Sequence, residues 1–399
     1  MKLLVSSCAR LFKTPNGDVY TPVAYGYDFY KRYLNVFDEV CVLGFCDTID
    51  ETRAEQMLKV TGNGVSVSEI TYPHGEWDYI RKKRRIIKEV NQIVDKSSAI
   101  LLRVPETLCF IVMNRAIRKK IPFSIEVVSD PLNLYTRATC PSKYRLVYKI
   151  WYYLQLRRAS YYANGTSYVT KFELQKHYPP NLTKENHFTS FYTDTNISIP
   201  KDIQPRKFPA QKKVRLIHIS VLINGFAKGH KEAIECLSKL IDNGINAELV
   251  LVGEGELDKA NIEFIDKNNL KDYIHFTGKL KTKQVIEELD KADIFLFPSY
   301  NEGLPRVVIE AMSRALPVIA TDIPGHRELL DKEFLAPVKD SQALFNIAKK
   351  MINNPDYYEM ASQRNIEKAR EYDIEIIEKK RNDFYKKLYV IANRVGKND

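Results

Sequence analysis

Short apolar runs rich in β-branched residues alternate along the chain with segments of helical periodicity. In the first half these runs are LLVSS, EVCVLGF, AILLRV, FSIEVVS and SYVT, and in the second half they are VRLIHIS, AELVLVG, YIHFTG, IFLFPS and PVIAT. Runs that are apolar on both faces indicate buried parallel strands covered by helices. The pattern predicts an α/β protein with doubly wound sheets, in which ligands bind beyond the carboxyl ends of the strands.

This alternation of predicted strands and helices is interrupted once, by the polar and proline-bearing passage IPKDIQPRKFPAQKK. A chain of 399 residues also exceeds the size of one ordinary core, which favours two domains. The sequence therefore predicts a first domain at residues 1–198, a linker at 199–213 and a second domain at 214–372. A last helical segment follows at residues 373–399.

Composition narrows the class of protein. The six cysteines form no CxxC pair and no cluster with histidine at zinc spacing, so neither a disulfide framework nor a metal site is indicated. No window approaches 18 apolar residues, and the N-terminal apolar run is too short for a signal peptide. These features predict a soluble or peripheral protein of a reducing cytoplasm.

The net charge of +11 is concentrated in the first half, where residues 1–200 carry 28 Lys and Arg against 19 Asp and Glu. Basic clusters lie at residues 81–85, 115–120 and 143–158, the last interleaved with aromatic residues. An anionic partner fits this distribution, as do helices with a solvated basic face. No nucleic-acid-binding module accompanies the clusters, so we expect no nucleic acid partner and favour an anionic membrane surface.

Three strand ends in the second half carry candidate binding residues. Lys228 precedes a predicted helix, where its charge adds to the positive end of the helix dipole, although a solvated loop lysine is the alternative. Gly253 and Glu254 follow one strand, and Lys279 and Leu280 follow another. Such loops either bring backbone close to a ligand such as a flat ring or serve as ordinary connections.

A fourth strand end, FPSYNEGLPRVVIEAM, holds two glutamates. Glu302 lies in the loop before a predicted helix that has Pro305 in its first turn, and Glu310 lies about 7.5 Å further along the axis at 1.5 Å per residue. Each carboxylate accepts two hydrogen bonds and suits adjacent hydroxyls, while the N–H groups near Gly303 and Leu304 suit a diphosphate. The alternative is one capping and one exposed glutamate.

In these residues the chain resembles the retaining glycosyltransferases of family 4, which have the GT-B fold of two Rossmann-like domains and an interdomain cleft. The resemblance is carried by the two glutamates with seven residues between them, in the context EGLPRVVIEAM followed by LPVIATDIPGHREL. In the first half, IEVVSDPLNLY and ANGTSYVTKFELQKHYPP are similar to passages of bacterial capsule, exopolysaccharide and lipopolysaccharide sugar transferases.

The resemblance implies a role for each candidate. Glu302 contacts hydroxyls of the donor sugar, Lys228 binds the donor diphosphate and Glu310 binds the ribose. Further donor contacts come from the following positions: Gly303, Leu304, Gly253, Glu254, Lys279 and Leu280. The family usually works without a metal or cofactor, and the departing phosphate helps to take the acceptor proton. Its last helix usually crosses back onto the first domain.

The chain departs from the family pattern at several positions. Ile223 stands where an arginine is common, and Ala315 stands where a glycine often ends the helix. The glycine-rich loop after the first strand is not evident, and Gly17 is the nearest candidate for it. Asp130 ends a strand, where it faces either the donor sugar or the acceptor hydroxyl, or serves as a turn or cap residue.

The resemblance predicts transfer of a sugar, with UDP as the expected nucleotide, to a lipid-diphosphate-linked or polysaccharide acceptor at the inner face of the cell membrane. Two alternatives stay open. A nucleotide-sugar epimerase of the same fold requires carboxylates and a histidine that converge on the sugar. The sequence shows no such set of residues. A non-catalytic sugar-binding or membrane-binding relative is kept open by Ile223.

Overall fold

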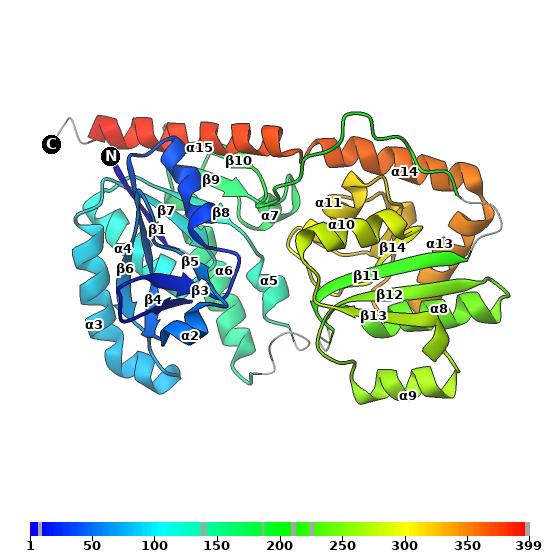
Figure 1. The fold of residues 1–399 in the computed structure, drawn as a ribbon. Helices are drawn as coiled ribbons and strands as arrows, with labels where there is room; N and C mark the ends of the chain where they lie inside the picture. Colours follow the sequence, from blue (N-terminus) through cyan, green and yellow to red (C-terminus); the bar gives the residue numbers. More distant parts are fainter. Residues whose placement is uncertain are drawn as a thin grey trace. The chain divides into compact units, whose positions relative to one another are not determined.

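The computed structural model describes residues 1–6, 10–136, 140, 142–185, 187–208, 213–223 and 227–395. Contacts divide the chain into two compact units, each built around its own sheet (Figure 1). Unit 1 comprises Met1–Leu132, Tyr144–Tyr192 and Glu378–Asp399, and unit 2 comprises Asn133–Lys143 and Thr193–Ile377. The last helix therefore begins in unit 2 and continues in unit 1.

The sheet of unit 1 is mostly parallel, in the order β10-β9-β8-β7-β1-β4-β2-β3-β5, with β6 also paired to β4. Its strands are β1 Lys2–Ser6, β2 Leu11–Lys13, β3 Val19–Thr21, β4 Glu39–Thr48, β5 Leu58–Lys59, β6 Val65–Thr71, β7 Ala99–Val104, β8 Phe123–Val127, β9 Gly165–Tyr168 and β10 Phe188–Phe191. The five runs expected in this half are confirmed as β1, β4, β7, β8 and β9. The sequence patterns missed the antiparallel β2–β3 hairpin and the strands β5, β6 and β10.

Helices on one face of this sheet enclose one part of the unit 1 core. The helices of this half, with the last helix, are α1 Tyr27–Tyr30, η1 Lys31–Asn35, α2 Glu51–Ala54, α3 Glu76–Val94, α4 Thr107–Lys119, α5 Pro131–Leu134, α6 Arg145–Tyr162, α7 Glu173–His177 and α15 Ile374–Val395. Buried side chains of α3, α4 and α6 pack with Ile125 and Val127 of β8. Successive side chains of a strand point to opposite faces of the sheet, so the residue between these two lies on the other face.

That residue is Glu126, which is 2% exposed and holds α15 against the sheet. Its carboxylate accepts hydrogen bonds from Tyr385 on α15 at 2.9 Å and from Tyr192 at 2.8 Å, and it pairs with the buried Arg103 of β7. The Tyr385 ring also lies 4.8 Å from the ring of Tyr33 in η1. A buried carboxylate is tolerated here because a charge and hydroxyl donors satisfy it.

Unit 2 has a fully parallel sheet in the order β13-β12-β11-β14-β15-β16. Its strands are β11 Val214–Leu222, β12 Ala247–Glu254, β13 Ile274–Gly278, β14 Ile294–Phe297, β15 Val318–Thr321 and β16 Leu335–Ala336, and the first five confirm the runs expected from the sequence. Its helices are α8 His230–Asp242, α9 Lys259–Lys267, η2 Lys271–Tyr273, α10 Thr282–Lys291, α11 Arg306–Ser313, α12 Pro324–Arg327, η3 Lys332–Phe334, α13 Ser341–Asn353 and α14 Pro355–Arg370. Strand order reverses on either side of β11, as in doubly wound folds.

The start of helix α11 differs by one residue from the expected position, and its end carries the alanine that departs from the family pattern. Pro305 is the N-cap residue and the helix begins at Arg306, so the proline lies one position before the expected first turn. At the other end Ala315 has a φ of 57°, in the left-handed region that glycine prefers. The Ser362 hydroxyl donates a 2.6 Å hydrogen bond to the Ala315 carbonyl, which helps to hold this conformation.

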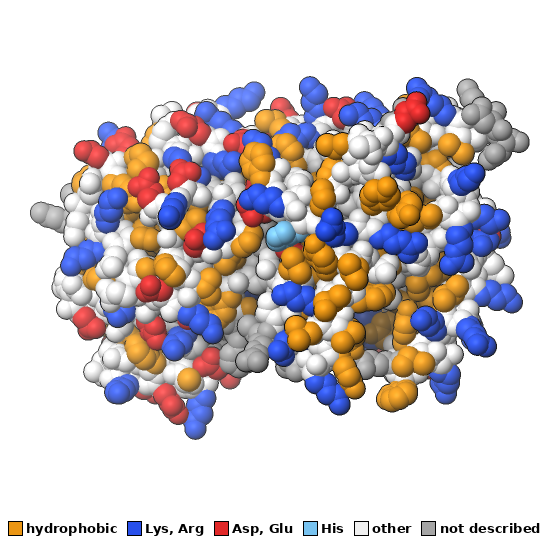
Figure 2. Space-filling model, turned by 180° about the vertical axis from the view of Figure 1, so that it is seen from behind, with side chains coloured by type: hydrophobic (Ala, Val, Ile, Leu, Met, Phe, Trp, Pro, Cys, Tyr) orange, Lys and Arg blue, Asp and Glu red, His pale blue; other side chains and the backbone are white. Residues whose placement is uncertain are grey.

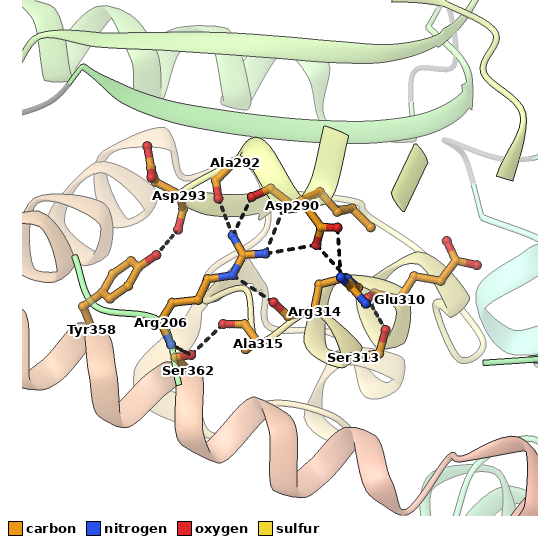
Figure 3. A network of polar contacts seen from close by, with 11 residues as sticks. Arg206, Asp290, Ala292, Asp293, Glu310, Ser313, Arg314, Ala315, Tyr358 and Ser362 are labelled. Atoms are coloured by element: carbon orange, nitrogen blue, oxygen red, sulfur yellow. Dashed lines mark hydrogen bonds and ion pairs between the residues drawn. The ribbon is translucent and has the colours of Figure 1, made fainter. Parts of the chain in front are cut away.

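The segment expected to be a linker packs against unit 2 through Arg206 (Figure 3). Its guanidinium donates to the Arg314 carbonyl beyond α11 at 2.8 Å, and to the carbonyls of Ala292 at 2.6 Å and Leu289 at 3.1 Å at the end of α10. The Arg206 N–H donates to the Ser362 hydroxyl of α14 at 2.8 Å. Because helix ends leave their last carbonyls unpaired, one arginine here satisfies the termini of two helices. Residues 209–212 of the segment lie outside the described residues.

Three buried histidines lie near the carboxyl edge of the unit 2 sheet. Burial lowers the pKa of His326 to about 4, and burial together with the Lys228 charge lowers that of His230 to about 4. The pKa of His218 is lowered well below its usual value for the same reason of burial. His326 Nδ1 lies 2.7 Å from the Thr321 carbonyl, which can only accept, so the neutral ring carries its proton on Nδ1. Unit 2 is therefore folded around uncharged imidazoles.

We expect Arg206→Met to loosen α10 and α11, because the guanidinium hydrogen bonds to the carbonyls of Leu289, Ala292 and Arg314 are lost and these carbonyls stay unpaired. The loss of about 3 kcal/mol predicts roughly 100-fold faster amide exchange in these helices. Hydrogen exchange is the suitable measurement, since both tryptophans, Trp77 and Trp151, lie in unit 1. Lys207→Met, at an exposed neighbour, should leave exchange unchanged, and equal rates in both variants would contradict this role.

We expect His326→Asn to reduce the acid sensitivity of unit 2. The unfolded chain protonates this histidine near its ordinary 6.5, whereas the folded chain does so only near 4, so stability falls as pH drops through this window. Over the whole window the effect approaches about 3 kcal/mol. Calorimetry at pH 7 and pH 5, values chosen around the ordinary pKa, should show a smaller fall in Tm for the variant than for the parent.

The matched control is His275→Asn, which removes an exposed histidine of the same unit. This control should keep the parent's pH dependence. A His326→Asn chain whose Tm falls as steeply as the parent's would overturn the assignment, whatever its stability at neutral pH.

Candidate functional site

The candidate residues of unit 2 follow strands that meet where the strand order reverses. β11 and β14 are hydrogen-bonded neighbours in the sheet although β12 and β13 lie between them in sequence. Lys228 lies in the loop that leaves β11, and Glu302 lies in the loop that leaves β14. The loops therefore leave neighbouring strands at the point where ligands of doubly wound sheets bind.

Lys228 and Glu302 form an ion pair in this loop region. The Lys228 Nζ and Glu302 Oε1 atoms are 2.7 Å apart, with the two side chains 35% and 16% exposed. The Ser299 hydroxyl donates to the same carboxylate oxygen at 2.8 Å and also lies 3.1 Å from the Ala227 carbonyl. Within the described residues, the second carboxylate oxygen of Glu302 makes no hydrogen bond and suits a hydroxyl, since a carboxylate accepts several hydrogen bonds.

Close backbone contacts fix the loops that carry this pair. The Tyr300 N–H donates to the Ala227 carbonyl at 2.8 Å. Gly229 has a φ of 74°, and any Cβ there would collide with the Pro298 carbonyl. A Cβ on Gly325 would likewise collide with the backbone of residues 302–303. Glycine is thus required at both positions.

Gly303 and Leu304 stand between Glu302 and α11, both partly exposed. Within the described part of the chain, their N–H groups make no hydrogen bond. Lys228 lies two residues before His230, the first residue of α8. This edge thus offers one cation, two unpaired loop N–H groups and a helix start, which are groups that bind phosphate.

Glu310 lies within α11, on a side chain that extends away from Arg206 (Figure 3). Burial raises the pKa of its carboxyl, and the positive charge of Arg306 opposes that shift. Among the residues that the structure describes, no hydrogen bond or ion pair engages this carboxylate. A partly buried carboxylate without a partner suits a pair of ligand hydroxyls.

The remaining unit 2 candidates lie at the ends of β12 and β13. Glu254 closes β12, and Lys279 and Leu280 follow β13. The Lys279 Nζ lies 3.5 Å from the Glu254 carboxylate, in an exposed pair of which each side chain is more than half exposed. Gly253 lies one residue before Glu254, and the structure brings these positions together on neighbouring strands.

Ile223, at the position where an arginine is common in the family, belongs to the core of unit 2. Its side chain is 3% exposed and its N–H donates to the Glu254 carbonyl at 2.9 Å. This position supplies no cation to the loops. Residues 224–226, which follow it, lie outside the described residues.

Two candidates, Asp130 and Gly17, lie in unit 1 and have structural partners there. The Asp130 carboxylate accepts hydrogen bonds from the Tyr178 hydroxyl at 2.6 Å and from the Leu132 N–H at 2.9 Å, and lies 3.1 Å from His177 Nδ1. Asp130 therefore acts as a turn residue here, which is one of the two roles that the sequence allowed, the other being contact with a ligand. Gly17, with a φ of 89°, lies in the turn of the β2–β3 hairpin, where its N–H donates to the Thr14 carbonyl.

Sequence reasoning missed two residues of this region, Ser299 and His326. Ser299 supports the Glu302 carboxylate, and the buried His326 Nε2 has no hydrogen-bond partner among the described residues. Neither has a spacing signal, although both lie in the passages that carry the resemblance. In the described ranges no group of three or more His, Cys, Asp or Glu residues is arranged to hold a metal ion, and no helix has the length and hydropathy to span a membrane.

The chain is similar to several known proteins. Residues 201–370 match the family described as Glycosyl transferases group 1. The chain is 27% identical to Protein CapJ of Staphylococcus aureus over 393 residues, which is 96% of each chain. It is 31% identical to the amylovoran biosynthesis glycosyltransferase AmsK of Erwinia amylovora over 157 residues, which is 36% of this chain and 38% of AmsK.

The fold is shared with solved structures. The crystal structure of Anabaena HepE in complex with UDP superimposes with a TM-score of 0.65 over 96% of this chain and 99% of HepE, at 16% identity. This likeness confirms the expected fold of two Rossmann-like units, and the family match confirms the expected class of enzyme. The protein therefore carries a group 1 glycosyl transferase domain at residues 201–370 and is a glycosyltransferase with the GT-B fold.

Proposed function

We propose that the protein transfers a sugar from a UDP-sugar donor to a lipid-linked or glycan acceptor. The reaction belongs to the synthesis of a bacterial surface polysaccharide and retains the anomeric configuration of the sugar. The observation that carries the proposal is the Lys228–Glu302 pair at the reversal of strand order in unit 2. The similarity to AmsK, named for amylovoran biosynthesis, supports the kind of product. The fold shared with UDP-bound HepE supports the nucleotide.

The donor diphosphate binds at Lys228 and at the N–H groups of Gly303 and Leu304. These groups neutralise the charge that develops on the phosphate as the bond to the sugar breaks. The Glu302 carboxylate, held by Ser299, accepts hydrogen bonds from hydroxyls of the donor sugar and orients it. Orientation of the sugar next to its own leaving group allows attack from the same face, so the phosphate takes the acceptor proton and no separate base is needed.

The nucleoside lies toward α11 and the ends of β12 and β13. Glu310 accepts hydrogen bonds from the two ribose hydroxyls, because its carboxylate has no partner within the described residues. The base lies against the backbone at Gly253 and Glu254 and the segment of Lys279 and Leu280. No metal takes part, since the cation and the backbone N–H groups hold the diphosphate.

We expect Lys228→Ala and Glu310→Ala each to weaken UDP binding about 10-fold or more, because each loses a charge-assisted hydrogen bond. Calorimetric titration of the full chain with UDP measures this, with GDP as the comparison nucleotide. Lys231→Ala and Glu287→Ala remove exposed charges from neighbouring helices and serve as matched controls. UDP affinity that is unchanged in both Lys228→Ala and Glu310→Ala would remove the basis of this donor site.

The stereochemical part is tested by the product. With UDP-sugars and a lipid-diphosphate sugar acceptor, we expect an extended product that has the donor's anomeric configuration by proton NMR. Glu302→Gln keeps the size of the side chain but weakens the acceptors, and should lower kcat about 10- to 100-fold. A product of inverted configuration would contradict retention, and an isomerised donor without transfer would contradict the transferase reaction for that sugar.

A further inference from the structure

Helix α6 of unit 1 exposes a stripe of large apolar side chains. Leu146, Val147, Ile150 and Leu154 are 61%, 63%, 59% and 55% exposed. At 100° per residue these positions fall within one arc of the helix, and the opposite side packs Leu156 into the unit 1 core. Single exposed apolar residues are ordinary, but four on one helix face mark an interaction surface.

The same arc becomes basic toward the end of the helix. Arg157, Arg158 and Tyr161 continue it, and with Tyr162 they line a cavity of about 690 Å³ whose other wall is the loop of residues 179–183. No acidic residue lines this cavity, and Leu182 in its wall is 75% exposed. An apolar stripe that leads into a pocket with two guanidinium groups is a surface with a nonpolar part and an anion-binding part.

The arginines of this pocket differ from two arginines of the basic cluster on α3. On α3, Arg81 pairs with Asp78 at 3.0 Å and Arg85 pairs with Glu89 at 2.7 Å. Arg157 and Arg158, in contrast, contact neutral groups among the described residues, a tyrosine hydroxyl at 3.3 Å and the Asn114 side-chain oxygen at 2.7 Å. Their positive charge is therefore uncompensated and open to an external anion.

We propose that this surface, formed by α6 and residues 179–183, docks the enzyme on an anionic phospholipid bilayer. The inference rests on the proposed function, in which the acceptor is lipid-linked. The apolar stripe enters the boundary of the acyl chains, and Arg157 and Arg158 bind headgroup phosphate, for which the planar guanidinium is suited. Trp151 and Tyr161, 39% and 56% exposed, are of the residue types that prefer the membrane interface.

Charge and shape favour a bilayer over other partners. An anionic membrane offers both an apolar layer and phosphates, so it complements both parts of the surface. A nucleic acid would engage the arginines and leave the aliphatic stripe in water, and a second copy of this chain would bring like charges together. Figure 2 shows hydrophobic side chains exposed among many lysines and arginines on the face of the protein that is seen from behind.

The test is co-sedimentation of the full chain with phosphatidylcholine vesicles, with and without phosphatidylglycerol. We expect binding that requires phosphatidylglycerol and that falls about 10-fold or more in Arg157→Gln/Arg158→Gln and in Leu146→Ser/Ile150→Ser/Leu154→Ser. Because all these side chains are exposed, the variants should fold. Arg81→Gln/Arg85→Gln removes the same charge from α3 and should bind like the parent.

Each outcome is decisive when UDP binding is titrated in the same samples. A parent chain that binds UDP but no vesicles overturns the docking surface and leaves the donor site intact. Vesicle binding without UDP binding supports docking and contradicts the proposed function. Parent-like binding by both α6 variants, loss of binding in the α3 control alone, or a solution dimer that only the α6 variants dissociate would each overturn the proposal.

Discussion

The side chain of Arg206 holds together the part of unit 2 on which the proposed donor site depends. A helix leaves its final carbonyls unpaired, and here one guanidinium donates to the ends of both α10 and α11 while its backbone binds α14. Helix α11 carries Glu310 and follows directly on the loop of Gly303 and Leu304. A shift of α11 would therefore move the proposed ribose contact and the proposed phosphate contact together. Fixing the helix end far from the ligand is what keeps the ligand end in place.

At the other end of the site the constraint is electrostatic. Lys228 and Glu302 neutralise each other at 2.7 Å, so neither charge is left unpaired in the chain without ligand. A diphosphate offers Lys228 a stronger partner, while Ser299 continues to hold the Glu302 carboxylate. Donor binding can then exchange one ion pair for another without leaving either group unsatisfied. Gly229 and Gly325 lie in close contact with neighbouring backbone at this edge, so the proposed exchange is one between side chains.

Periodicity predicted the ten main strands, since buried parallel strands carry long apolar runs, and the spacing of the two glutamates located the α11 region. It missed β2, β3, β5, β6, β10 and β16, of which only β6 is longer than four residues. Composition predicted an interdomain linker at residues 199–213 but not its anchor, because a polar stretch with prolines looks the same whether or not it packs against a domain. Only the tertiary structure shows that Arg206 donates hydrogen bonds to helix carbonyls, since every residue has a carbonyl and the sequence does not mark which of them accept. Ser299 and His326 were missed for the same reason, as their partners are distant groups and main-chain atoms.

The position of Ile223 has a physical explanation in this arrangement. Its side chain is packed in the core of unit 2, so an arginine in the same orientation would bury a charge at a cost of several kcal/mol. The chain thus retains one described cation beside the candidate phosphate position, and the remaining neutralisation falls to backbone N–H groups at residues 303–304 and at the start of α8. Backbone dipoles are fixed by the fold and need no reorganisation when charge develops on a leaving phosphate. In the proposed donor site, backbone N–H groups fixed by the fold therefore take the place of the missing side-chain charge.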